Sequence, residues 1–185
     1  MHLKNQKIII VTCGLFEKKT TMHIRKEVSS IFQREVDIVD CALNVTQFYN
    51  PGRRQYDADI LLELLPGQIE KGYMKYMILF RGDLFIPILT YIFGQAQLNG
   101  RYGIASLFRL RNELYGLKEN YELMLERFTK VVVHELGHTF GLIHCNNPVC
   151  IMRSSTYVED LDQKELRFCP RCRELLDKYP ESKQE

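Results

Sequence analysis

The stretch HELGHTFGLIH, residues 134–144, restricts the fold more than any other feature of the chain, because its three histidines suit a single metal ion. His134 and His138 are four residues apart, so on a helix they lie on one face, one turn from each other. Gly141 can take a positive φ and end the helix, which would let His144 approach the same ion. Three neutral imidazoles leave a fourth position for water, the arrangement of a catalytic zinc.

Glu135 follows the first histidine and projects from a neighbouring face of the expected helix. This position suits a general base that takes a proton from a water at the zinc, rather than a zinc ligand. The alternative is a chance HExxH pattern, since a lone helical histidine is usually a polar surface or core residue. Three histidines, a glutamate and a glycine at fixed spacing favour the metal site, and His2 and His23 are expected to face solvent.

A second cluster of metal-binding residue types follows directly, in the form of Cys145, Cys150, Cys169 and Cys172. Two close cysteine pairs separated by a short insert are typical of a four-thiolate structural zinc site. Free buried thiols or a redox CxxC pair are the alternatives. If the chain is extended after the helix, neighbouring side chains point in opposite directions, so His144 turns toward the first metal and Cys145 away from it. The sequence therefore predicts two zinc ions, one catalytic and one structural.

The bulk properties exclude several classes of protein. The chain has 185 residues, 45% of them apolar and 26% charged, as expected for one soluble globular domain. A net charge of +2 is too small to indicate a nucleic-acid-binding surface. No apolar run is long enough for a membrane span, and no signal peptide is recognisable. We therefore expect a cytoplasmic protein with reduced cysteines, in which Cys13 and Cys41 are packed thiols in strands.

The hydrophobic pattern indicates an α/β fold that begins with a right-handed strand–helix–strand unit. The expected elements are a strand at 7–14, a helix at 20–36, a strand at 36–43, a loop at 44–55, a helix at 56–65, a strand at 73–85 with a polar exit at Asp83, a hairpin of 92–98 and 102–110 around Asn99-Gly100, and a helix at 119–141. Residues 179–185 are expected to be a flexible tail after a single domain of residues 1–178.

At this point the sequence resembles a known family. HELGHTFGLIH, Cys145, Cys150, Ile151-Met152 and the CPRC pair are similar to the archaemetzincins, a branch of the metzincin zinc peptidases, and weaker similarity extends upstream through FGQAQLNGRYGIASLFRLR. The resemblance implies a compact metzincin-like peptidase domain with a twisted mixed sheet, a backing helix, an active-site helix and a small zinc-stapled part at about 145–178. It also places Met152 in a methionine turn beneath the catalytic zinc, whereas the sequence alone suggests a core methionine.

These observations lead to a zinc-dependent peptidase in which Glu135 is the general base. Peptides are the expected substrate, lying as an added strand along residues 103–108, unless these form an ordinary paired strand. Tyr157 is a candidate helper, although a packed or exposed tyrosine is the simpler interpretation. The rival functions are a non-enzymatic two-zinc module that binds a partner protein and a nucleic-acid-binding zinc protein. Glu135 argues against the first and the small net charge against the second. A monomer is favoured.

Overall fold

The first strand is apolar on both faces, which places it in the interior of a sheet. The computed structural model describes residues 6–41, 45–64, 67, 69 and 71–180. In it, all six residues of β1 (Ile8–Cys13) are buried. β1 pairs in parallel with β2 (Val36–Cys41) and with β5 (Lys75–Phe80), and α1 (Lys18–Phe32) connects β1 to β2. The predicted strand–helix–strand unit is confirmed.

The predicted hairpin completes this sheet, but its outer strand is not the one expected to receive a substrate. β9 (Tyr102–Ser106) pairs in parallel with β5 and antiparallel with β8 (Gly94–Ala96), giving the order β2-β1-β5-β9-β8. The expectation of an open edge at 103–108 is therefore wrong, because β9 lies between two strands. Four of the five residues of β9 are buried, whereas the three residues of β8 are half-buried, as suits an edge.

A second sheet was not predicted. It consists of β3 (Tyr49–Asn50), β4 (Gln55–Asp57), β6 (Leu84–Ile86) and β7 (Leu89–Ile92), in the order β3-β4-β6-β7. The expected strand at 73–85 is in fact β5 and β6, which lie in different sheets. Asp83, between them, is not a polar exit to solvent. Its carboxylate is 6% exposed and accepts two hydrogen bonds from Arg109.

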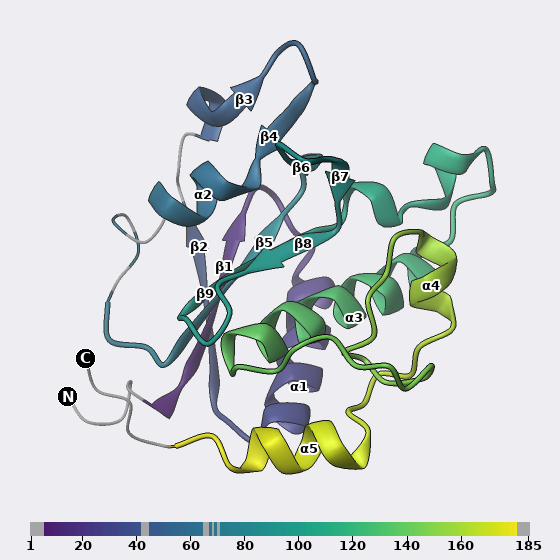
Figure 1. Ribbon diagram of the computed structural model, residues 1–185. Coiled ribbons are helices and arrows are strands. Elements are labelled where there is room, and N and C mark those ends of the chain that lie inside the picture. The colour runs from purple at the N-terminus through teal and green to yellow at the C-terminus, as the bar shows by residue number, and fades with distance from the viewer. Residues whose placement is uncertain (1–5, 42–44, 65–66, 68, 70, 181–185) are drawn as a thin grey trace.

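Helices cover both faces of the five-stranded sheet (Figure 1). α1 and the long α3 (Tyr121–Thr139) pack on one face, against Ile8, Ile10 and Met77. The opposite face, with Ile9 and Val11, is covered by α2 (Ala58–Leu64), the helix expected at 56–65. Residues 42–44, 65 and 66 lie outside the described part of the chain. The α/β fold class with a mixed sheet is confirmed.

Short helical segments make up much of the remaining chain. The turns η2 (Val45–Phe48), η4 (Phe108–Leu110) and η5 (Asn112–Tyr115) are single 3₁₀ turns. Two α-helices form the C-terminal part: α4 (Val158–Asp162) lies beside α3, and α5 (Pro170–Asp177) lies below α1 (Figure 1), where Arg173 donates to the Ile31 carbonyl at 2.8 Å. Residues 153–165 are mostly polar in sequence. Val158 and Leu161 of α4 are nevertheless buried in the same apolar cluster as α3, so this segment packs on the core.

Tyr179, the first residue of the expected tail, packs its ring on Phe140, and its hydroxyl contacts the ammonium of Lys75. Residues 181–185 of that tail, and His2, lie outside the described residues. The helices formed by the described residues are each too short or too polar to cross a membrane.

Candidate active site

α3 carries two of the predicted metal ligands and ends where the sequence suggests. The Asn120 side chain caps its start by accepting a hydrogen bond from the Leu123 amide at 3.0 Å. His134 and His138 follow on one face, and Gly141 takes a φ of +85° just beyond the helix. This turn sends the chain back toward the helix and brings His144 beside the first two imidazoles.

The three imidazoles face a common point. His134, His138 and His144 each offer a ring nitrogen, and these atoms all lie within 4.8 Å of one another. The Nε2 atoms of His134 and His138 are 3.1 Å apart. A tetrahedral zinc with Zn–N bonds of about 2.0–2.1 Å separates its nitrogen ligands by roughly 3.3 Å, so the spacing fits such an ion.

Backbone carbonyls occupy the Nδ1 atoms of His134 and His138, which leaves their Nε2 atoms available. His134 Nδ1 lies 2.8 Å from the Ile151 oxygen, and His138 Nδ1 lies 2.7 Å from the Leu142 oxygen. A carbonyl only accepts, so each Nδ1 carries the proton and each Nε2 has a free lone pair. Burial lowers the pKa of His134 well below its ordinary value, and burial also lowers the pKa of His138 and of His144. Neutral imidazoles are the form that binds a metal.

Glu135 lines the same cleft as the three histidines, but its carboxylate does not belong to their group of ring nitrogens. Its side chain is buried beside Gly94 of β8, where an added Cβ would stand 2.7 Å from the Glu135 Cγ and 2.9 Å from its Oε1. A glycine at this position therefore allows the carboxylate to lie against the edge strand. Burial raises the pKa of Glu135 to about 8, with the positive charge of Lys164 acting in the opposite direction.

The four cysteines form a second group, whose sulfur atoms also lie within 4.8 Å of one another. The Sγ atoms of Cys145 and Cys169 are 3.8 Å apart, which matches the roughly 3.8 Å expected for two sulfurs on a tetrahedral zinc with Zn–S bonds of about 2.3 Å. Burial raises the pKa of the Cys150 and Cys172 thiols, whereas in Cys169 hydrogen bonds from Cys172 and the other thiols outweigh burial and bring the pKa to about 7. The spacing of the sulfur atoms, rather than their acidity, shows that the group fits a zinc ion.

The structure also shows where the neighbouring residues of this region lie. His144 belongs to the imidazole group and Cys145 to the thiol group, so adjacent side chains face different sites. Met152 is fully buried, and a Cβ on Gly137 of α3 would lie 2.5 Å from its Sδ. Met152 thus packs directly against the helix that bears the histidines.

A cleft of about 660 Å³ lies over the imidazole group. One wall is formed by β7 and the edge strand β8, and the opposite wall by residues 154–157. The Tyr91 hydroxyl of β7 donates to the Thr156 carbonyl at 3.0 Å and so connects the two walls. Many lining side chains are apolar, among them Ile86, Leu89, Ile92, Phe93, Leu98, Val131, Ile143 and Leu161.

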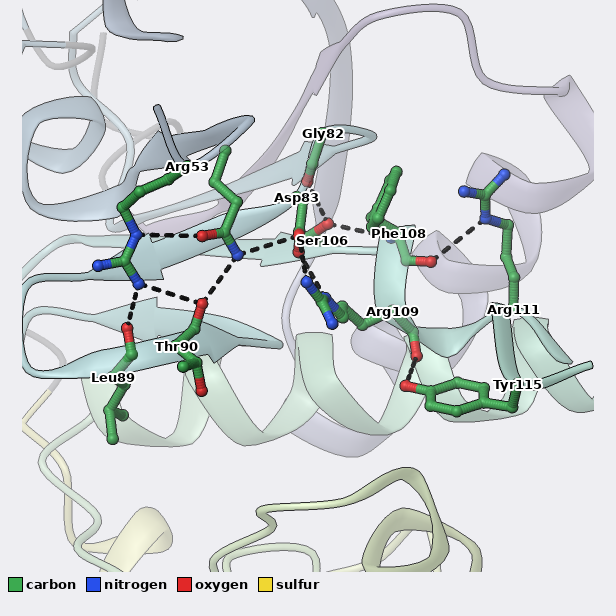
Figure 2. A network of polar contacts seen from close by, with 11 residues as sticks. Arg53, Gly82, Asp83, Leu89, Thr90, Ser106, Phe108, Arg109, Arg111 and Tyr115 are labelled. Carbon is green, nitrogen blue, oxygen red and sulfur yellow. Dashed lines mark hydrogen bonds and ion pairs between the residues drawn. The ribbon is translucent and has the colours of Figure 1, made fainter. Parts of the chain in front are cut away.

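A polar network around the buried side chains of Gln55 and Asp83 fixes the β7 wall of the cleft (Figure 2). Arg53 and Gln55 both donate to the Thr90 carbonyl, at 3.2 and 2.9 Å. Gln55 also donates to Asp83 at 3.0 Å, and Arg109 reaches the same carboxylate through two bonds of 2.9 and 2.6 Å. Figure 2 shows Arg53 approaching β7 from one side while Arg109 meets Asp83 from the other. The network therefore ties the small sheet to the segment that follows β9.

Two residues of the site have no clear sequence signal. Gly94 stands in a short polar hairpin arm, and Lys164 stands in a run of mostly polar residues, yet Lys164 is 3% exposed and lines the cleft. Burial lowers the pKa of the Lys164 ammonium to about 8.

Tyr157, the candidate helper, lines the cleft with 63% of its surface exposed and stands at the start of α4. His23 is half-buried on α1.

The remaining cysteines lie away from both groups. Cys13 and Cys41 end β1 and β2 as partners in register, and both contact the apolar cluster under α2. None of the chain's six cysteines forms a disulfide. The packing of Cys13 and Cys41 agrees with the expectation of packed thiols in strands.

Comparisons with known proteins give a consistent result. The model of peptidase family M54 matches residues 44–178, which include both candidate metal sites. The archaemetzincin of Saccharolobus islandicus is 38% identical over 187 residues, covering 98% of this chain and 100% of that protein. The archaemetzincin of Saccharolobus solfataricus is 37% identical over the same length.

Solved structures agree with the sequence relatives. The crystal structure of the archaemetzincin from Methanopyrus kandleri superposes with a TM-score of 0.83 at 33% identity, covering 97% of each chain. A zinc-dependent peptidase from Methanocorpusculum labreanum gives a TM-score of 0.77 at 28% identity, covering 91% of this chain and 99% of that one. The likeness therefore extends over nearly the whole fold.

Proposed function

This chain belongs to the archaemetzincins, peptidase family M54, and is a zinc metallopeptidase. On that basis we propose that it cleaves peptides with Glu135 as the general base and with His134, His138 and His144 as the ligands of a catalytic zinc. Cys145, Cys150, Cys169 and Cys172 would hold a second, structural zinc, giving two ions in all.

The placement of Glu135 carries this proposal. Among the described residues, the group around the histidine site consists of three imidazoles, and the Glu135 carboxylate stands outside it. The carboxylate is nevertheless buried in the wall of the same cleft. An acidic group beside a metal site, but not in it, is suited to moving a proton rather than to binding the ion.

The residues of the site would divide the reaction between them. Zinc, when bound, supplies a Lewis acid that polarises the scissile carbonyl and lowers the pKa of water. Glu135 removes the proton from the attacking water and passes it to the nitrogen of the leaving amine. A general base works best when its pKa lies near the working pH, and burial raises the pKa of Glu135 from its ordinary value in that direction. The carbonyls of Ile151 and Leu142 keep His134 and His138 in the tautomer that presents Nε2.

The substrate would lie along β8 instead of β9. β8 is the edge of the five-stranded sheet next to the cleft, so its outward backbone groups can pair with an extended peptide. A cleft of about 660 Å³ has room for a short peptide, and its apolar lining favours apolar side chains.

We further propose that the enzyme acts as a monomer in the cytoplasm, where thiolate ligands stay reduced, and that nucleic acid is not a partner.

A digest of a peptide library by the zinc-loaded protein and its Glu135→Gln variant tests this function. We expect the variant to retain its zinc and to lose activity by about 10²-fold or more, as for removal of a general base. Glu126→Gln is the matched control, because Glu126 stands on the same helix but pairs with Lys130 at 2.6 Å and does not line the cleft. Cleavage by Glu135→Gln at the rate of the control would show that Glu135 is not the base.

A further inference from the structure

Lys164 is a buried lysine in the wall of the proposed catalytic cleft. It follows α4, and its side chain is 3% exposed although it lines the cleft beside His134 and Glu135. Removing an ammonium group from water costs several kcal/mol, on the order given by ion-transfer energies, unless its donors are paired. The hydrogen-bond partners of the Lys164 ammonium group therefore indicate why it is buried despite this cost.

The ammonium group of Lys164 binds two backbone carbonyls. It donates to the Ile151 oxygen at 3.4 Å and, in a short contact, to the Arg153 oxygen. These carbonyls stand on either side of Met152, whose sulfur packs against Gly137 of α3. One lysine thus holds both ends of the turn that lies beneath the histidine-bearing helix.

The Ile151 carbonyl is shared with a proposed metal ligand. His134 Nδ1 donates to the same oxygen at 2.8 Å. The position of this oxygen fixes the tilt of the imidazole and hence the direction of its Nε2, which lies 3.1 Å from that of His138. A displacement of the carbonyl would turn the ring away from the common point of the three imidazoles.

We propose that Lys164 is a positioning residue of the metal site, which orients His134 by holding the carbonyl of Ile151. The proposal rests on the proposed role of His134 as a ligand. It differs from a purely structural role, in which Lys164 would only fasten the C-terminal part to the core. Groups that orient a metal ligand commonly change metal affinity by about 10–100-fold when they are removed.

Lys130 provides a matched control for the loss of a buried ammonium. It is 2% exposed on α3, and its Nζ donates to the Leu161 carbonyl of α4 at 3.0 Å and pairs with Glu126. Lys130 therefore fastens the same C-terminal part to the core, but its carbonyl partner accepts no hydrogen bond from a histidine of the described residues. A structural effect should appear in Lys130→Met and Lys164→Met alike, whereas a positioning effect should appear only in the second.

The test measures the zinc affinity of the histidine site by competition with a chelator, in protein whose thiolate site is filled. We expect both methionine variants to melt at lower temperature, but only Lys164→Met to bind zinc at least about 10-fold more weakly. Lys164→Arg keeps donors for the carbonyls and should recover most of the affinity. The absorption spectrum of the cobalt-loaded site gives a second measurement, which should change in Lys164→Met and not in Lys130→Met.

Equal zinc affinity and equal cobalt spectra in the two methionine variants would overturn the proposal. If Lys164→Met does not fold, Lys164→Gln replaces it, since the glutamine amide is uncharged and stands on a shorter side chain, and it should still weaken zinc binding beyond Lys130→Met. The outcome is independent of peptide cleavage. A His134→Ala variant with unchanged zinc affinity would instead show that the ligand assignment itself has failed.

Discussion

Gly94→Ala should disable the enzyme without removing its metal, because Gly94 leaves the space in which the Glu135 side chain lies. An alanine Cβ would stand 2.7 Å from the Glu135 Cγ and 2.7 Å from the Ile104 carbonyl oxygen. Carbon atoms in ordinary contact are about 3.5–4.0 Å apart, so roughly 1 Å of movement is required. Ile104 cannot yield easily, since β9 is paired on both sides. Glu135 must therefore move, or β8 must part from β9.

The expected cost follows from that displacement. A misplacement of about 1 Å can reduce catalysis by on the order of 10²-fold, and overpacking typically costs about 1–3 kcal/mol of stability. The alanine Cβ meets no imidazole among its nearest atoms, so zinc content should not change. We expect kcat to fall about 100-fold, while the zinc-to-protein ratio measured by metal analysis stays at the wild-type value.

Gly103→Ala is the control in the same hairpin. Its added Cβ would meet the Met77 Sδ at 3.3 Å and the Ala96 Cβ at 3.5 Å, and a flexible methionine side chain can move by that amount. This variant should keep its activity within about threefold, at a cost below about 1.5 kcal/mol. If Gly94→Ala turns over peptides as fast as Gly103→Ala, Glu135 is not held against β8 as the structure shows.

Three further predictions concern metal and pH. The purified protein should carry about two zinc ions, and mild chelation followed by metal analysis should remove the histidine-bound ion first, because that site has an open position; a single ion bound by both His144 and Cys145 would contradict two separate sites. Cys169→Ser should lower the melting temperature by several degrees and expose residues 145–172 to hydrogen exchange. The lost free energy of unfolding should be smaller than the roughly 10 kcal/mol of zinc binding by isolated zinc peptides, since α4 also packs in the core. Protection of these residues equal to that in Glu135→Gln would refute a structural role of the thiolate site. In protein lacking the histidine-bound ion, Glu135→Gln should become increasingly more stable than wild type as the pH rises from 4.5 to about 8. Over that window the unfolded carboxyl loses its proton while the buried one keeps it, so the wild-type fold loses up to roughly 5 kcal/mol at about 1.36 kcal/mol per pH unit. A difference in denaturation midpoint that does not vary with pH would exclude the raised pKa.

The sequence predicted those features that depend on short-range spacing. The i, i+4 histidines, the glycine with positive φ at Gly141 and the alternate directions of His144 and Cys145 follow from local geometry, and the structure brings the chosen side chains into two groups. The buried strand–helix–strand unit could be predicted equally well from the sequence, because β1 is long and apolar. By contrast, the strands of the second sheet have two to four residues, which is too short for a hydrophobic period to show.

Features set by tertiary contacts could not be predicted in this way. The burial of Asp83 depends on Arg109, which stands 26 residues later, so a lone aspartate after a strand looks like an exit to solvent. Either arm of the hairpin could pair with β5, and the arm that does not pair becomes the edge strand. The hydrophobic periodicity of the sequence does not decide which arm this is. Lys164 looks like an ordinary surface lysine until α4 packs against α3 and turns its side chain inward.

These long-range contacts have a consequence for how the active site is assembled. The HELGH helix supplies His134, but the carbonyl that orients its ring belongs to Ile151. That carbonyl lies one residue before Met152, whose own carbonyl accepts a hydrogen bond from the Cys145 amide at 2.9 Å. Cys145 in turn belongs to the group of four thiols, two of which, Cys169 and Cys172, stand in the C-terminal part. The histidine motif alone therefore cannot form a metal site of defined geometry. The segment after it must first fold back under the helix, and a thiolate zinc next to His144 would stabilise that return.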